Sequence, residues 1–130
     1  MSHPIVVLQG ALVSALRDDP LLDGVGVFDA PAVGAERPWI AIARHDVIAR
    51  DGDLAPGHEH RVLVHVWAAE ASRRAAMEIA ERVVAGAIGF VVSGLVVTMR
   101  RHDRTDTAMD GATGVARAVV SLRFYSEPAA

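Results

Sequence analysis

The sequence predicts an α+β fold in which two helices cover one face of a single, mostly antiparallel sheet. Residues 61–88 run from an apolar strand, Val62 to Trp67, into an amphipathic helix, Ser72 to Ile88. Residues 116–125 alternate apolar and polar side chains, as a half-buried strand does. The full order is α-β-β-β-α-β-β, and consecutive strands with short connections favour antiparallel pairing.

The first half of the chain supplies one helix and three strands. An apolar stripe predicts a helix over residues 4–17, which a following Asp-Asp-Pro ends. Strands are predicted at residues 25–28, 39–48 and 62–67, each rich in branched or aromatic side chains. Residues 49–59 contain glycine, proline and three acids, which predicts a long polar loop.

The second half supplies the helix at residues 72–88 and two further strands. One strand is predicted at residues 95–101 and the last at 116–125. Residues 102–114, HDRTDTAMDGATG, are predicted to form a second long polar loop. No internal repeat or composition change divides the chain, so we expect one domain over residues 1–130.

Composition narrows the function classes. The chain has 130 residues, 52% of them hydrophobic, and a formal net charge of -3, which points neither to disorder nor to a global attraction for nucleic acid. All 13 basic side chains are arginine. The absence of cysteine excludes disulfides, thiolate metal sites and a cysteine nucleophile. No run reaches the roughly 18 apolar residues of a membrane span, and the N-terminus lacks a signal-peptide pattern, so we expect a soluble intracellular or particle-bound protein.

Five segments occur in the order and spacing of a known family. They are LQGALVSALRDDPLL at 8–22, VFD at 27–29, PWIAI at 38–42, HVW at 65–67 leading into the second helix, and the final strand with alternating Val, Arg and aromatic residues at 119–125. With these segments the chain resembles the tail-completion, or tail-terminator, proteins of long-tailed bacteriophages and gene transfer agents. The family strand often has a glycine after HVW, where this chain has Ala68, Ala69 and Glu70.

The resemblance implies a structural role. Such proteins cap the finished tail tube and join it to the head in the virion or phage-like particle, after assembly in the host cytoplasm. It implies a homo-oligomeric, hexameric ring with a lumen that DNA crosses and contacts without sequence specificity. The implied partners are the tail tube protein and head-tail connector proteins. It implies no enzyme activity, no cofactor and no membrane contact.

Catalytic and metal sites are not supported by the residue patterns. His58 and His60 fall on one side of a strand and His65 on the other, so three ligands do not converge on one ion. The acids between His102 and Asp110 do not follow the calcium-loop pattern. No serine lies in a hydrolase motif. We expect neither catalytic residues nor a metal site.

The expected function is assembly through the polar loops. Candidate interface residues are listed in chain order: Arg50, Asp51, Asp53, His58, Glu59, Arg100, Arg101, Arg104, Asp106 and Asp110. Charge reversal at Arg100 and Arg101 is expected to leave the fold intact and abolish assembly. The alternatives are another head-tail joining protein, such as an adaptor or stopper, and a small dimeric ligand-binding domain.

Overall fold

A computed structural model describes residues 3–30, 34–50 and 56–129 of the chain. The elements in chain order are α1 (Pro4–Arg17), the 3-10 helix η1 (Pro20–Leu22), β1 (Gly26–Phe28), β2 (Trp39–Ala49), β3 (His58–Trp67), α2 (Arg73–Gly89), β4 (Leu95–Met109) and β5 (Ala116–Pro128). The predicted order α-β-β-β-α-β-β is confirmed.

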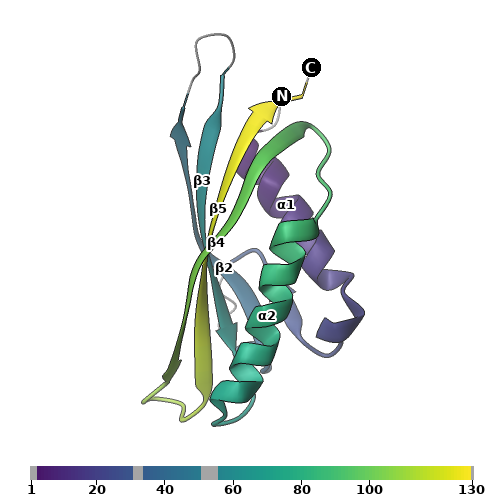
Figure 1. Cartoon of the computed structure of the whole chain (residues 1–130). Coiled ribbons are helices and arrows are strands. Elements are labelled where there is room, and N and C mark those ends of the chain that lie inside the picture. The colour runs from purple at the N-terminus through teal and green to yellow at the C-terminus, as the bar shows by residue number, and fades with distance from the viewer. Residues whose placement is uncertain (1–2, 31–33, 51–55, 130) are drawn as a thin grey trace.

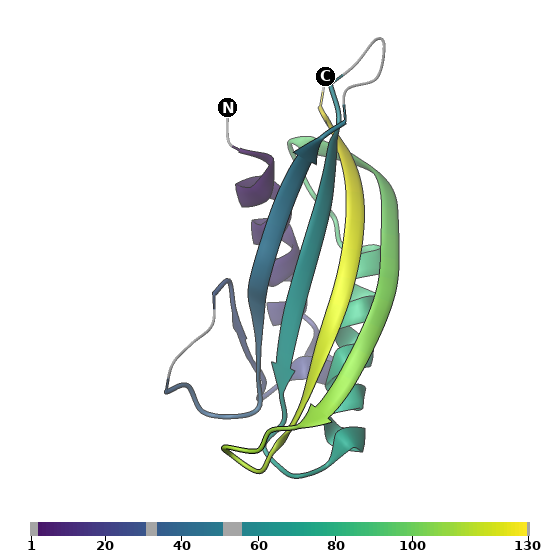
Figure 2. The same cartoon turned by 90° about the vertical axis from the view of Figure 1, so that its left-hand side faces the viewer.

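One five-stranded sheet carries the fold, with the strand order β1-β2-β3-β5-β4. The short β1 is parallel to β2, and the other neighbours are antiparallel. Both helices lie on the same side of the sheet, and its other side is uncovered (Figures 1 and 2). The prediction of a mostly antiparallel sheet with one covered face is therefore confirmed.

The core lies between the helices and the covered face. β3 and β5 show why: every second side chain is buried along each strand, from Val62 to Val66 and from Ala116 to Phe124. Leu8, Leu12 and Leu16 of α1 fall at helical spacing and are completely buried against this layer. Burial of apolar area on one side of the sheet thus fixes the register of the strands.

Local signals set where each helix begins. Pro4 stands in the first turn of α1, where its missing N–H costs no hydrogen bond, and the His3 side chain accepts from the backbone N–H of Ile5. The Ser72 hydroxyl accepts a 3.1 Å hydrogen bond from the N–H of Ala75 at the start of α2.

The second predicted loop is wrong over most of its length. β4 continues through residues 102–109, and only residues 110–114 form the turn to β5. Thr105 and Thr107 pair in register with Val120 and Ala118 of β5, so the backbone ladder persists beneath a charged sequence. β4 is an edge strand, where charged side chains can remain in solvent. Its residues 102–109 therefore lack the apolar pattern by which a strand is recognised in the sequence.

The first predicted loop is wrong at its ends. β2 reaches Ala49 and β3 begins at His58, so His58 and Glu59 belong to a strand. Arg50 also lies at a pairing position, because its N–H donates to the carbonyl of Gly57 at 2.8 Å. The centre of the predicted loop, residues 51–55, lies outside the described residues.

A chain of buried polar side chains crosses the covered face. His45 Nε2 lies 2.9 Å from His60 Nδ1, and His60 Nε2 lies 2.7 Å from the hydroxyl of Ser126. His60 and Ser126 are completely buried. Burial is the largest cause that lowers the pKa of His45 and of His60 to about 4, and the charges of neighbouring histidines contribute to the shift of His60.

These histidines predict a loss of stability in mild acid. Between pH 6.5 and 4 the unfolded chain takes up protons on both histidines that the folded chain does not, so the free energy of unfolding falls as pH decreases. Such a shift corresponds to roughly 3 kcal/mol for one histidine, an upper value because both side chains are screened in part by solvent and are coupled to each other. Urea unfolding at a series of pH values measures it. His45→Gln should remove much of the slope, and His102→Gln, at an exposed position, should keep it. Equal slopes in wild type and H45Q would contradict this account.

Candidate assembly surface

The uncovered face of the sheet gathers most of the charged strand residues. Because side chains alternate along each strand, the register places one residue from each of β2, β3, β5 and β4 side by side on this face. Five such rows follow from one end to the other: Trp39, Trp67, Arg117 and Ala108; Ala41, His65, Val119 and Asp106; Arg44, Leu63, Ser121 and Arg104; Asp46, Arg61, Arg123 and Arg101; Ile48, Glu59, Tyr125 and Met99.

Four carboxylates on this face are paired with arginines, whereas Glu127, near its end, makes no salt bridge among the described residues. The salt bridges are Arg44 with Asp46 at 2.8 Å, Arg61 with Glu59 at 2.8 Å, Arg104 with Asp106 at 2.7 Å, and Asp103 with Arg101 at 3.2 Å and Arg123 at 3.0 Å. Such exposed pairs contribute little to stability. Their effect is to hold the side chains in a fixed pattern, in which five arginines pair with four carboxylates.

Asp103 occupies a special position within this pattern. A register shift between His102 and Arg104 interrupts the pairing of β4 with β5 and allows Asp103 to reach two arginines. The hydrogen bond from Arg123 is the largest of the contacts that lower the pKa of Asp103. The carboxylate therefore remains charged over the physiological pH range.

Aromatic side chains occupy one end of the face. The rings of Trp39 and Trp67 lie 5.8 Å apart, and Phe28 meets Trp39 edge-on at 6.5 Å. The guanidinium groups of Arg37 and Arg117 lie 6.0 and 5.8 Å from the centre of the Trp67 ring. Both tryptophans of the chain are thus on the uncovered face rather than in the core, and both are only partly buried.

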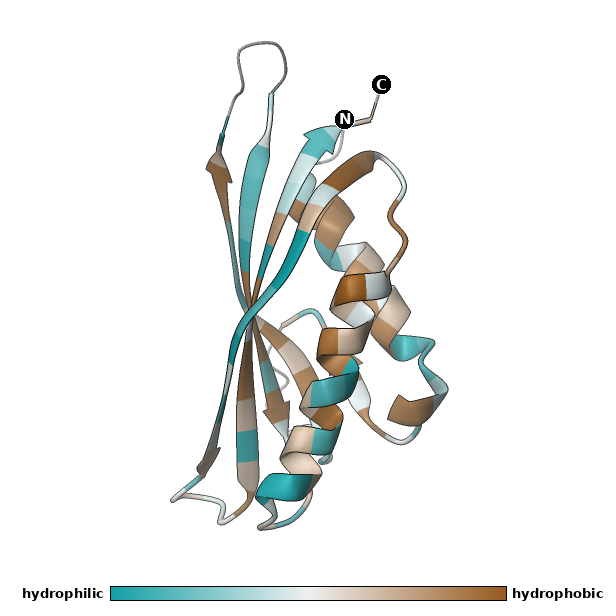
Figure 3. Ribbon diagram, in the orientation of Figure 1, coloured by the Kyte–Doolittle hydropathy of each residue, from teal (hydrophilic) through white to brown (hydrophobic). Residues whose placement is uncertain are grey.

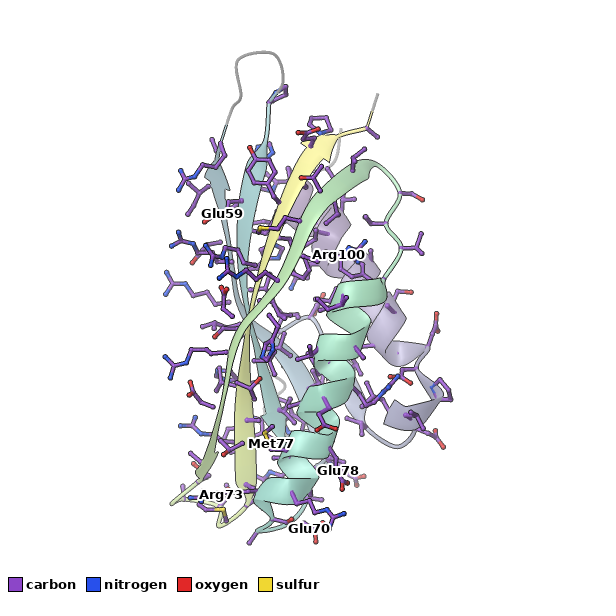
Figure 4. The ribbon with its side chains drawn as sticks, in the orientation of Figure 1. Glu59, Glu70, Arg73, Met77, Glu78 and Arg100 are labelled. Carbon is purple, nitrogen blue, oxygen red and sulfur yellow. The ribbon has the colours of Figure 1, made fainter. Side chains whose placement is uncertain are left out.

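The structure separates the ten candidate interface residues into groups. Glu59, Arg101, Arg104 and Asp106 lie together on the uncovered face. Arg100 projects to the covered face beside α2, opposite to Glu59 (Figure 4).

The remaining candidates lie elsewhere. His58 also belongs to the covered face. Asp110 lies in the β4–β5 turn, where it accepts from the N–H and hydroxyl of Thr113. The backbone carbonyl of Arg50 accepts from the Tyr125 hydroxyl. Asp51 and Asp53 lie outside the described residues.

Several residues of this face were not among the sequence candidates. They are Trp39, Arg44, Arg61, Trp67, Arg117 and Arg123. The signal was present in the strand alternation, because arginine or tryptophan stands at alternate positions between buried residues. The alternation alone does not identify these residues as one surface, because one strand does not show which neighbours complete a row.

Other kinds of site find no support in the part of the chain that the structure describes. No group of three or more His, Asp or Glu side chains there is placed to hold a metal ion. No helix among the described residues is long and apolar enough to cross a membrane.

Comparisons with known proteins agree on one family. The sequence matches the family model of the tail completion protein gp17 over residues 10–127. A chain in the solved virion of a native gene transfer agent particle superposes with a TM-score of 0.81 at 21% identity, covering 97% of this chain and 99% of that chain. The bacteriophage SPP1 gp17 protein superposes with a TM-score of 0.59 at 19% identity, covering 91% and 87%. At these identities the two structures show a shared fold. The comparison with curated proteins finds no match.

Neighbouring arginines on opposite faces predict different effects on stability. The guanidinium of Arg100 lies 4.4 Å from the centre of the Phe90 ring and donates to the carbonyl of Ala87 at 3.3 Å. Arg100→Ala should therefore lower the free energy of unfolding by about 1–2 kcal/mol. Arg101→Ala, which loses one exposed ion pair, should change it by less than about 0.5 kcal/mol. Urea unfolding of both variants measures the difference, and equal losses would show that the two positions are not distinguished in this way.

Proposed function

We propose that this chain, which belongs to the tail completion protein gp17 family, closes the end of a finished tail tube as a ring and joins the tube to the head. It is a structural tail component and not an enzyme. In this proposal DNA passes through the lumen of the ring, and the tail tube protein and the connector proteins of the head are its partners. Its place is the tail-head junction of a phage or a phage-like particle.

The family match carries this proposal. It spans residues 10–127, so it involves both helices and every strand rather than one shared motif. The gene transfer agent chain supports it from the fold, because that chain and this one cover each other almost completely. The surfaces of the sheet and helices are therefore the candidate contact surfaces.

The charged rows suit a subunit in a protein assembly. Their carboxylates are already paired with arginines, so the face has a fixed polar pattern with a modest positive excess. We propose that Glu59, Arg101, Arg104 and Asp106 contribute to contacts within the ring or with the adjoining tube. Arg100 is less suited to test such contacts, because it packs on Phe90.

The first experiment measures assembly directly. We expect the purified protein, alone or mixed with tail tubes, to form rings of about six subunits that appear at tube ends in negative-stain images, with their mass given by light scattering. Arg101→Glu with Arg104→Glu should keep the fold and reduce tube capping, because both exposed ion pairs would become repulsive. Arg74→Glu is the matched control, since it reverses an exposed charge on α2.

Two experimental outcomes would indicate a different function. Rings that bind only the head side of the junction would indicate an adaptor or stopper. A stable dimer that ignores tube ends, and whose melting temperature rises with a nucleotide or metal, would indicate a ligand-binding domain.

A further inference from the structure

One apolar side chain projects from the acidic side of the molecule. Leu21 in η1 is 70% exposed, whereas its neighbour Leu22 is buried. Asp18 and Asp23 flank it and are exposed, and no salt bridge among the described residues involves either one. We call residues 18–23 the acidic knob. In Figure 3 it forms a short brown segment between teal ones, just beyond the end of α1.

The acidic knob is held in a fixed shape. Asp19 accepts from the N–H of Leu21 at 3.0 Å and from Arg82 Nε of α2 at 2.9 Å. These contacts lower the pKa of Asp19, with the hydrogen bond from Arg82 as the largest cause, so the carboxylate stays charged. A surface that is already ordered loses little conformational entropy when it binds. Because these contacts fix the backbone around it, the exposed Leu21 side chain is suited to pack into an apolar surface of a partner protein.

The aromatic end of the uncovered face has the complementary chemistry. Trp39 and Trp67 give an apolar platform, and Arg37 and Arg117 lie beside it. Neither arginine makes a salt bridge among the described residues, and both act on the Asp110 carboxylate only at longer range, where they lower its pKa. Tryptophan and arginine are the residue types that most often anchor protein interfaces. We call these four residues the aromatic socket. Its partner should offer an apolar side chain within an acidic rim.

We propose that the acidic knob of one subunit docks on the aromatic socket of the next copy of the chain. The knob supplies Leu21 for the tryptophans and two aspartates for the two arginines. This inference rests on the proposed ring, and it names the contact that closes it.

The positions of the two surfaces favour a ring. The knob lies on the helix side of the molecule and the socket on the uncovered side (Figure 1). One subunit can therefore use both at once, and such head-to-tail contacts close into a ring when the rotation fits. Edge pairing is the less suitable route, because β4 is charged and has two register shifts, and β1 has only three residues.

A charge-swap experiment tests the contact. The knob variant is Asp18→Arg with Asp23→Arg, and the socket variant is Arg37→Glu with Arg117→Glu. We expect each variant alone to fall from ring mass to single-subunit mass, and an equal mixture to regain rings in which the two alternate. Both tryptophans lie in the socket, so their emission should shift to shorter wavelength on mixing. Glu78→Arg with Glu81→Arg reverses the same charge elsewhere on the helix side and should assemble normally.

The chain has no cysteine, so a disulfide can report the contact even where rings are scarce. Leu21→Cys and His65→Cys proteins, mixed and oxidised, should give a mixed dimer that the knob charge reversal prevents. Ala85→Cys replaces Leu21→Cys in the control and should give none. Cross-linking without wild-type rings would support the contact and reject the ring of the proposed function.

Other results would overturn the inference while leaving the proposed function in place. Normal rings from both variants alone would show that the contact is not used. His65→Cys dimers with themselves would show that the uncovered faces meet each other. Socket variants that form normal rings but lose binding to double-stranded DNA would place the socket on the lumen.

Discussion

Packing of both helices on one side of the sheet is the constraint on which the rest depends. It buries alternate side chains of β3 and β5 and leaves the intervening ones outside. A shift of one residue in either strand would exchange the two sets, so the core holds the outer pattern in place. The arrangement of the charged rows and the tryptophans on the outer face therefore depends on the packing of buried leucines and valines.

The exposed edge of the sheet has features that oppose non-specific pairing with other strands. β4 is long and lies at the sheet edge, where unpaired backbone groups could recruit any extended chain. Its two register shifts twist the strand, and its run of charges from Arg100 to Asp106 opposes edge pairing. Because the edge is unfavourable for pairing, specific contacts are left to the faces and the knob. This division suits a subunit of the proposed ring.

The sequence predicted the fold correctly where apolar side chains follow one clear helical or strand periodicity. The stripe of α1, the strand-to-helix segment around Trp67 and the alternation of β5 predicted the element order and the covered face, and the structure confirms both. Prediction failed in the second part of β4, residues 102–109, because charged residues of an edge strand resemble a loop when the paired strand is unknown. Arg100 and Arg101 looked equivalent as neighbours, yet the pleat sends one to Phe90 and the other to Asp103. Which side chains of different strands are neighbours depends on strand pairing and register. The contact between Trp39 and Trp67 could therefore not be predicted from their positions in the sequence.

The use of arginine follows from the same geometry. Its planar fork lets Arg123 and Arg101 share Asp103, and lets Arg117 lie against an indole ring. A lysine would supply the charge without the second contact or the flat surface. Arg37 and Arg117 lie near the Trp67 ring and make no salt bridge among the described residues, so their hydrogen-bonding capacity remains available to a partner, although both act on Asp110 at longer range. The charged rows satisfy themselves within the subunit, whereas the socket and the knob leave charges of opposite sign for the neighbouring copy.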